Sequence, residues 1–443
     1  MAESYDFIVI GARCGGSPTA MLLARKGYTV LMVDRATFPS DTVSTHFIHA
    51  PGMAALERWG LRDSLVASGC PPIRTYRFDF GPFTIAGSPR PSDGIDEAYC
   101  PRRPVLDTIL VHAAADAGVE VRQGFSVDEV LIEDGTVVGV RGRNADSGAV
   151  TERAKVVVGA DGRNSAVAKA VHPDQYNEKP AVTPAFYSYW SGVGSSGFEV
   201  SVRPPFGMAA FPTHDDLTLV IVGLPQDAFN AARGDVEGTF LRAVDSAPAL
   251  GDRVRSGKRE ERFRTASDLA GHFRKPYGPG WALVGDAGYH LHPITAQGIT
   301  DAFVDAERLT DALDAAFTER SRYADAMAAY QAARDEQAMP MYEMTSTSPR
   351  STSPSRPRRN NCWERSPVTS KPWTTLSVSK QARCRSPCSS APRTSGASWP
   401  STGRRHSSTR HRPVSTSRVC AVVPRARRRR GRRAGCSKGS ARR

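Results

Sequence analysis

The sequence has few cysteines before its last hundred residues, and it has no long apolar run. Residues 1–344 hold only Cys14, Cys70 and Cys100, with no Cys-x-x-Cys pair, which excludes a disulfide framework. No run approaches the roughly 20 apolar residues of a membrane span. The opening "MAESYDFIVIGA" lacks the basic region and long apolar stretch of a secretory signal. We therefore expect a cytoplasmic protein without a membrane span.

Charge is unevenly distributed along the chain. Residues 345–443 hold 25 of the 59 Lys+Arg and only one of the 45 Asp+Glu, Glu364. The formal charge of +14 therefore combines a body of −10 with a tail of +24. A mildly acidic body of this length can bury a large core and form one large or two intermeshed domains.

The tail of residues 345–443 is rich in Ser, Arg, Thr and Pro and has almost no apolar periodicity. This composition predicts a disordered basic tail, and "RARRRRGRR" at 425–433 would also suit nucleic acid. Translation in the wrong frame of GC-rich DNA gives the same composition. Read one nucleotide earlier, 361–364 yields Leu-Leu-Gly whatever the codons, and permitted codons turn 360–375 into an amphipathic helix pattern. We favour the frame error, and we expect no nucleic-acid partner.

The most informative segment is "YDFIVIGARCGGSPTAMLLARKGYTVLMVDR", residues 5–35. It predicts a buried strand at Phe7–Ile10, a glycine turn, a helix and a second strand at Thr29–Val33. Such a βαβ unit offers the bare N–H groups of its turn and helix N-terminus to a pyrophosphate. Asp34, 23 residues after Gly11, stands where a carboxylate takes the ribose hydroxyls. The segment therefore predicts dinucleotide binding.

The glycine turn departs from Gly-x-Gly-x-x-Gly in one place. The second glycine of that pattern lets the backbone approach the phosphates, but Arg13 fills its position between Gly11 and Gly16. The guanidinium can point at the phosphates, or outward with only the Arg13 backbone in the turn, and the sequence leaves both open. Cys14 in this loop is interpreted as a small filler rather than a reactive thiol.

Two further apolar strands end beside an acid and a glycine. The first, Val156–Val158, follows an antiparallel meander that turns at Asp134-Gly135. It runs into Asp161-Gly162, and Asn164 or Ser165 is placed to cap the next helix. Ligands gather at such strand ends in α/β folds.

The second strand, Trp281–Val284, runs into Gly285-Asp286, and apolar residues from Ile299 to Leu313 then mark one face of a helix. His290 and His292 lie in the loop between, but no nearby spacing supplies the remaining ligands of a zinc site. A Ser-His-Asp arrangement would also lack a G-x-S-x-G elbow. We expect structural roles for both histidines and for His214, although each is a conceivable proton donor or substrate contact.

Residues 180–270 have a different character, because "TPAFYSYWSGV" and "LTLVIVGLP" alternate like sheet strands. One strand carries four aromatic residues: Phe186, Tyr187, Tyr189 and Trp190. They can line an aromatic pocket, or half of them can simply pack the sheet. The sequence leaves these alternatives open.

Three motifs in this order resemble FAD-dependent monooxygenases of the aromatic-hydroxylase type (the para-hydroxybenzoate hydroxylase fold) and their geranylgeranyl-reductase-like relatives. They are the Gly11–Gly16 turn, Asp161-Gly162, and Gly285-Asp286 with the residues up to Gly298. The resemblance covers roughly residues 5–340. It implies an α/β fold with a Rossmann-like FAD-binding domain, a β-meander and a mixed-sheet substrate domain.

On this basis we expect a discontinuous FAD-binding domain at 1–172 and 271–344, a substrate-binding sheet domain at 173–270, and the basic low-complexity tail at 345–443. Residues of about 70–100 are candidates to join the substrate domain.

The resemblance also implies the residues that surround the FAD. The glycine turn would hold the pyrophosphate, and Asp34 would hold the adenosine ribose. Asp286 would hydrogen-bond the ribityl–phosphate region, Pro293 would lie against the isoalloxazine, and the helix that begins near Gly298 would face N1 and O2 of the flavin. The expected cofactor-binding residues are Gly11, Ala12, Gly15, Gly16, Asp34, Arg35, Arg103, Asp161, Gly162, Gly285, Asp286, Pro293, Gln297 and Gly298.

The implied activity is monooxygenation with NAD(P)H as co-substrate. A flavin C4a-hydroperoxide would give one oxygen to an aromatic or polyketide-like small molecule, and no side chain need act as a covalent catalyst. Tyr289 stands where hydroxylases often have histidine, and Thr300 where they favour asparagine. One alternative is therefore a flavin reductase of isoprenoid double bonds, and another is an FAD or nucleic-acid binding protein that uses its basic tail. Substrate, nicotinamide preference and oligomeric state stay open.

Overall fold

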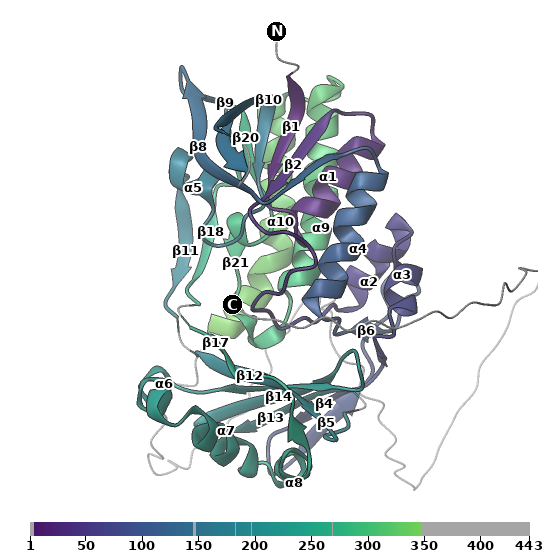
Figure 1. Ribbon diagram of the computed structural model, residues 1–443, viewed down its shortest axis with the longest axis vertical. Helices are drawn as coiled ribbons and strands as arrows, with labels where there is room; N and C mark the ends of the chain where they lie inside the picture. The colour runs from purple at the N-terminus through teal and green to yellow at the C-terminus, as the bar shows by residue number, and fades with distance from the viewer. Residues whose placement is uncertain (1–3, 145–147, 182, 196, 268, 347–443) are drawn as a thin grey trace, which may run out of the picture. The chain divides into compact units, whose positions relative to one another are not determined.

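The computed structural model describes residues 4–144, 148–181, 183–195, 197–267 and 269–346 (Figure 1). The basic tail from residue 347 onward lies outside the described residues, so the structure does not test the three interpretations of it. Within the described part of the chain, none of the helices is long and apolar enough to cross a membrane.

A largely parallel sheet organises the first layer of the α/β fold, with strands paired in the order β19-β20-β10-β1-β2-β7. Apart from the antiparallel β19, these neighbours run parallel. The strands are β1 (Tyr5–Ile10), β2 (Val30–Asp34), β7 (Glu120–Gln123), β10 (Val150–Gly159), β19 (Tyr277–Gly278) and β20 (Trp281–Leu283).

The two faces of this sheet bury alternate residues of the same strand. Phe7 and Val9 pack against helices, whereas Ile8 and Ile10 pack against the meander hairpin and a short helix. Period-two alternation produces this division, because successive side chains of a strand point to opposite faces. The helices on the first face are α1 (Gly16–Arg25), α2 (Ala50–Trp59), α3 (Arg62–Ala67), α4 (Arg103–Asp116), α9 (Gly298–Phe317) and α10 (Tyr323–Ser346). The other face carries β8 (Phe125–Glu133), β9 (Thr136–Asn144) and α5 (Ala166–Val171).

A second, mixed sheet has the order β16-β12-β15-β14-β13-β4-β5, with β17 also paired to β12. Its pairs are antiparallel except for β13 and β4, which run parallel. The strands are β4 (Tyr76–Asp79), β5 (Thr84–Gly87), β12 (Ala185–Ser191), β13 (Phe198–Arg203), β14 (Phe206–Pro212), β15 (Thr218–Gly223), β16 (Lys258–Arg259) and β17 (Arg264–Ala266).

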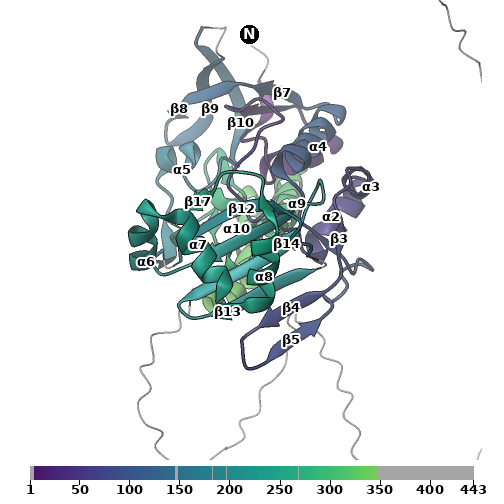
Figure 2. The same cartoon turned by 60° about the horizontal axis from the view of Figure 1, so that its bottom comes forward.

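Short helices cover one face of the mixed sheet, as Figure 2 shows for α7 and α8. These helices are α6 (Gln226–Ala231), η1 (Ala232–Gly234), α7 (Val236–Asp245) and α8 (Pro248–Ser256). Two smaller sheets are also present. One pairs β3 (Pro72–Ile73) with β6 (Ala98–Tyr99), and the other has three strands in the order β11 (Gln175–Lys179), β18 (Gly271–Arg274) and β21 (Tyr289–His290). Two 3-10 turns, η2 (Gly285–Ala287) and η3 (Pro293–Thr295), lead into α9.

Candidate cofactor site

The three motifs meet at one edge of the parallel sheet. Ile10 at the end of β1 stands beside Gly159 of β10, and Gly159 stands beside Leu283 of β20. Each motif begins within two residues of its strand end, so all three emerge side by side. The carboxyl edge of a parallel sheet is where α/β folds bind their ligands.

In the glycine turn, backbone segments approach one another too closely for a side chain. Gly11 has a φ of +102°, and a Cβ there would stand 2.5 Å from the Ala160 carbonyl oxygen. A Cβ on Gly16 would stand 1.7 Å from the Gly11 carbonyl oxygen. Helix α1 follows with no side-chain cap and no acid in its first turn. Its N–H groups and positive dipole end are therefore open to an anion.

Asp34 ties the end of β2 to this turn. Its Oδ2 accepts the backbone N–H of Ala12 at 2.7 Å, and its Oδ1 accepts that of Ala36 at 2.7 Å. Asp34 is half-buried and the neighbouring Arg35 is exposed. Each carboxylate oxygen keeps a lone pair that a ribose hydroxyl can use.

Arg13 points away from the turn. Its guanidinium pairs with Asp107 of α4, donates to the Ser40 carbonyl at 3.2 Å and the Ser40 hydroxyl at 3.1 Å, and lies 5.1 Å from the centre of the Phe38 ring. Of the two orientations that the sequence left open, the structure has the outward one. Only the Arg13 backbone takes the place of the missing glycine.

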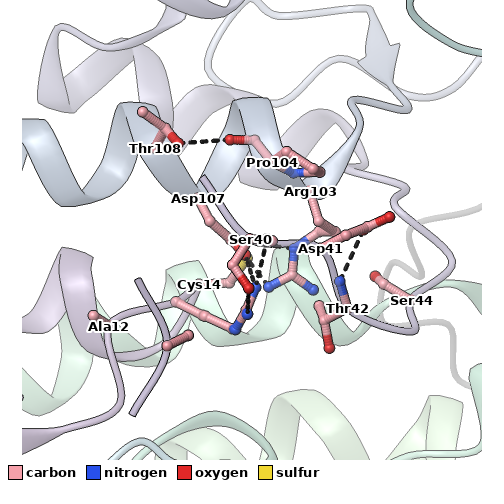
Figure 3. Close-up of polar contacts among 12 residues, drawn as sticks. Ala12, Cys14, Ser40, Asp41, Thr42, Ser44, Arg103, Pro104, Asp107 and Thr108 are labelled. Atoms are coloured by element: carbon pink, nitrogen blue, oxygen red, sulfur yellow. Dashed lines mark hydrogen bonds and ion pairs between the residues drawn. The ribbon is translucent and has the colours of Figure 1, made fainter. Parts of the chain in front are cut away.

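Arg103 begins α4 and is buried. Its Nε and Nη2 donate to Asp107 Oδ1 at 3.1 and 2.9 Å (Figure 3). The Cys14 sulfur lies 3.6 Å from the same oxygen. Burial raises the pKa of Cys14 to about 12, so this thiol stays protonated at neutral pH and is a filler rather than a nucleophile.

Asp161 works locally as a helix cap. Its Oδ2 accepts the Ala166 N–H at 2.6 Å, and Ser165 accepts the Ala168 N–H at 3.2 Å at the start of α5. The Asp161 Oδ1 atom is buried without a hydrogen-bond partner, and burial raises the pKa of this carboxyl. Gly162 follows with a φ of +80°. An unpaired buried acceptor at the strand-end edge fits a ligand hydroxyl or amide donor.

The third motif leaves its polar groups accessible. Asp286 in η2 and Gly298 at the start of α9 are exposed, whereas Pro293 and Gln297 are half-buried and Gly285 is buried. Helix α9 has no side-chain cap, and nothing lies within 4 Å of a Cβ built on Gly298. These features fit the approach of a flat, polar-edged group such as the isoalloxazine.

The histidines of the loop and of the mixed sheet have structural contacts. His290 Nδ1 lies 3.0 Å from the Ala270 carbonyl, and His292 accepts the Ile294 N–H at 3.3 Å. His214 accepts the Arg102 N–H at 3.1 Å and contacts the Ser68 hydroxyl at 2.9 Å. Among the described residues no group of His, Cys, Asp or Glu is arranged to hold a metal ion.

The four aromatic residues of β12 divide between the two faces of the mixed sheet. Phe186 and Trp190 pack under the short helices, whereas Tyr187 and Tyr189 belong to a cluster with Phe47 and Ala296. Half of them therefore pack the sheet. The other two are also buried, and they pack in the cluster that includes Ala296 of the loop between Pro293 and α9.

Sequence reasoning missed the residues opposite these tyrosines. His46 has a φ of +60°, is buried, and places Nε2 2.6 Å from the Tyr189 hydroxyl. The Arg102 guanidinium lies 4.0 Å from the centre of the same ring. His49 joins the Thr295 carbonyl at 2.9 Å, and burial lowers its pKa to about 4. The only available signal was the pair of histidines in "STHFIHAPG" ahead of α2.

Comparison with known proteins gives one family and several relatives. Residues 4–345 match the family described as FAD binding domain. A tryptophan 2-halogenase of Chondromyces crocatus is 24% identical over 315 residues, which cover 68% of this chain and 59% of that protein. A digeranylgeranylglycerophospholipid reductase of Methanocella arvoryzae is 28% identical over 309 residues, 68% of this chain and 75% of that protein. This chain thus spans less than two thirds of the halogenase.

Solved structures share the fold. The myxobacterial chondrochloren halogenase CndH has a TM-score of 0.71 at 24% identity, over 77% of this chain and 82% of that one. PqsL, a probable FAD-dependent monooxygenase from Pseudomonas aeruginosa, has a TM-score of 0.65 at 20% identity, over 77% and 95%. The expectation of an FAD-binding α/β fold with a second, mixed sheet is confirmed. The chain belongs to the FAD binding domain family, as its three motifs predicted, and a geranylgeranyl-reductase relative is among the similar proteins.

Proposed function

We propose that the carboxyl edge of the parallel sheet binds FAD and that the chain is an NAD(P)H-dependent monooxygenase of an aromatic or polyketide-like small molecule. The observation that carries the proposal is the meeting of three motifs at one edge, between the uncapped N-termini of α1 and α9. FAD has a pyrophosphate in its middle and an electron-accepting ring at one end, and both suit a positive helix end.

Each motif has a role in this proposal. The backbone N–H groups from Gly11 to Gly16 hold the pyrophosphate, and the free lone pairs of Asp34 accept from the adenosine ribose. Asp286 accepts from a hydroxyl of the ribityl region, for which its exposure leaves room. Asp161 offers its unpaired oxygen to the cofactor or the nicotinamide. Pro293 would lie against the isoalloxazine.

The bound FAD supplies the redox and oxygen chemistry, and the chain positions the substrate. The α9 N-terminus would stabilise negative charge on a bound flavin ring, and fixed donors of this kind commonly contribute a few kcal/mol each. Tyr187 and Tyr189 lie on the sheet face toward this site and exclude water. Burial raises the pKa of both hydroxyls, so both stay protonated at physiological pH.

Reduction of isoprenoid double bonds is the second candidate. The reductase of Methanocella arvoryzae, at 28% identity over 75% of its length, favours it, as do Tyr289 and Thr300 at positions where hydroxylases commonly differ. Thr300 contributes to the fold, because its hydroxyl accepts the His49 N–H at 2.9 Å. Both candidate functions require FAD. They differ in whether the electrons pass to oxygen or to an isoprenoid double bond.

Stopped-flow spectroscopy of the flavin-loaded protein tests the proposal. We expect NADPH or NADH to bleach the 450 nm band without oxygen, and oxygen with an aromatic substrate to return it and give a product 16 Da heavier. A product 2 Da heavier, formed from an isoprenoid without oxygen, would favour the reductase. Failure of both nicotinamides to reduce the bound flavin would contradict the NAD(P)H requirement.

A further inference from the structure

We propose that Asp107 is a positioning residue of the FAD site, which holds the Arg13 side chain away from the glycine turn and fixes the orientation of Arg103. The inference rests on the proposed FAD site and adds to it a residue that is not part of any of the three motifs. Figure 3 shows Asp107 reaching from α4 toward Cys14, Ser40 and Arg103.

The Asp107 carboxylate is shared between two arginines and is completely buried. Its side chain has 0% exposure, and those of Arg13 and Arg103 have 23% and 8%. Oδ2 accepts from Arg13, while Oδ1 accepts twice from Arg103, at 3.1 and 2.9 Å. A carboxylate this buried needs such partners, because an unpaired charge in the interior is strongly unfavourable.

The arrangement explains how an arginine is tolerated in place of the second glycine. A free guanidinium beside the turn would compete with backbone N–H groups for the pyrophosphate and would obstruct its approach. Asp107 removes it from the turn, and Ser40 and Phe38 complete the new environment of the guanidinium. The phosphate-binding loop, the segment after β2 and α4 are thereby connected through one carboxylate.

Charge supports the same role. One carboxylate stands between two guanidinium groups, so it offsets their mutual repulsion beside the turn. Arg103 is also within electrostatic reach of Asp286, because Asp286 contributes to raising the Arg103 pKa. Asp107 therefore orients an arginine whose charge acts on Asp286 of the third motif. Loss of the carboxylate would leave a buried and a half-buried guanidinium that repel each other.

The first test compares Asp107→Asn with a matched control. Glu97 is an equivalent carboxylate elsewhere in the fold: its side chain is 3% exposed and pairs with Arg62 at 2.6 Å and Arg74 at 2.5 Å. We expect Asp107→Asn to weaken FAD binding by about tenfold or more, and Glu97→Gln to change it by less than about threefold. FAD is titrated into the flavin-free full-length chain, and its fluorescence is followed.

The second test uses Arg13→Met, which leaves the buried carboxylate in place. We expect the FAD dissociation constant to stay within about threefold of the original, because the side chain does not touch the phosphates. In the Asp107→Asn background the same change should recover at least about threefold of the lost affinity, since it removes the unpaired guanidinium. A merely structural role of Asp107 would give no such recovery.

Three outcomes would overturn the inference: Asp107→Asn binds FAD like the original chain or like Glu97→Gln, Arg13→Met alone loses about tenfold, or no recovery follows in the double variant. If Asp107→Asn does not fold, Arg13→Met alone decides. An original chain that binds no FAD would contradict the cofactor site itself, and the two failures are therefore distinguishable.

Discussion

At Gly16 the backbone of the turn returns to within contact of its own start, since an added Cβ would stand 1.7 Å from the Gly11 carbonyl oxygen. The obstacle is backbone, which cannot rotate away like a flexible side chain. Gly11 and Gly16 are therefore steric requirements of this fold. Arg13 shows the complementary case, where a large side chain is accepted because it can be directed elsewhere.

Replacement of Gly16 by alanine is expected to lower the free energy of unfolding by about 1–3 kcal/mol, the usual range for overpacking. Urea unfolding of the flavin-free chain measures it. Gly207→Ala is the control, because nothing lies within 4 Å of a Cβ there, and it should change stability by less than about 0.5 kcal/mol. Equal effects of the two substitutions would contradict the claim that a side chain at Gly16 clashes with the backbone.

Two acids inside α9 predict a pH dependence of stability. Burial, with the charge of Asp305, raises the pKa of Asp301 to about 8, and burial raises that of Asp305 to about 7 despite Arg334 and Arg308. Their ordinary value is 3.8. Between these limits the folded protein holds protons that the unfolded chain has released, so stability is fully present below about pH 4 and falls as the pH rises toward 8.

The double variant Asp301→Asn, Asp305→Asn should remove this dependence, since asparagine resembles the protonated acid. We expect it to match the original chain near pH 4 and to exceed its unfolding free energy by on the order of a few kcal/mol at pH 8. Denaturation series at several pH values check this. Parallel curves for the two proteins would show that these acids are ionised in the folded state.

At the scale of the element, the alternating side chains of strand β12 point to opposite faces of the mixed sheet and make different contacts there. Trp190 stacks on Phe240 with ring centres 5.8 Å apart under the short helices, whereas Tyr189 contacts His46 on the opposite face. Substitutions one residue apart should therefore have different consequences. A helix with the same residues would spread them around its circumference and could not divide them this way.

Trp190→Ala is expected to cost about 3–5 kcal/mol of stability, as for other buried large-to-small changes, while FAD affinity stays within about twofold. Tyr189→Phe should cost about 1–3 kcal/mol, because it leaves a buried His46 nitrogen without its partner. Thermal unfolding and flavin titration of both variants measure this. A large loss of FAD affinity in Trp190→Ala would mean that the two faces are coupled.

Regular periodicity decides which elements were predictable from the sequence. Strands β1, β2 and β20 lie within a residue or two of the segments expected for them, and Asp134-Gly135 forms the expected turn with positive φ at both residues. The apolar face of α9 is buried as expected, but Asp301 and Asp305 are buried as well. Amphipathicity alone would place these acids in solvent. Instead α10 and η2 pack against α9, and the sequence pattern of one helix does not show which elements will pack on it.

The contacts between β12 and the loop that carries His46 were not predictable for a different reason. The loop that carries His46 has no period and no motif, and its partners Tyr189 and Thr295 are far away in the sequence. The parallel pairing of β13 with β4 joins Phe198 to Tyr76 across more than a hundred residues. Such contacts follow from the packing of the whole chain rather than from any local pattern.

At the scale of the whole molecule, every residue assigned to the FAD site lies between Gly11 and Gly298, ahead of the basic tail. A chain that ends at Ser346 should therefore bind FAD with an affinity within about twofold of the full chain. Any affinity for duplex DNA should disappear with the tail and should fall steeply with salt in the full chain, because residues 1–344 carry −10. Salt-independent DNA binding by the shortened chain would contradict this division.

The central claim is that one FAD binds at the edge where β1, β10 and β20 end. Isothermal titration of FAD into the flavin-free full-length protein, with Gly11→Val beside it, tests this most directly. We expect one FAD bound per chain and no measurable binding by the valine variant, because its side chain would enter the space of the Ala160 carbonyl. Saturable binding of equal strength in both proteins, or none in the original chain, would contradict it.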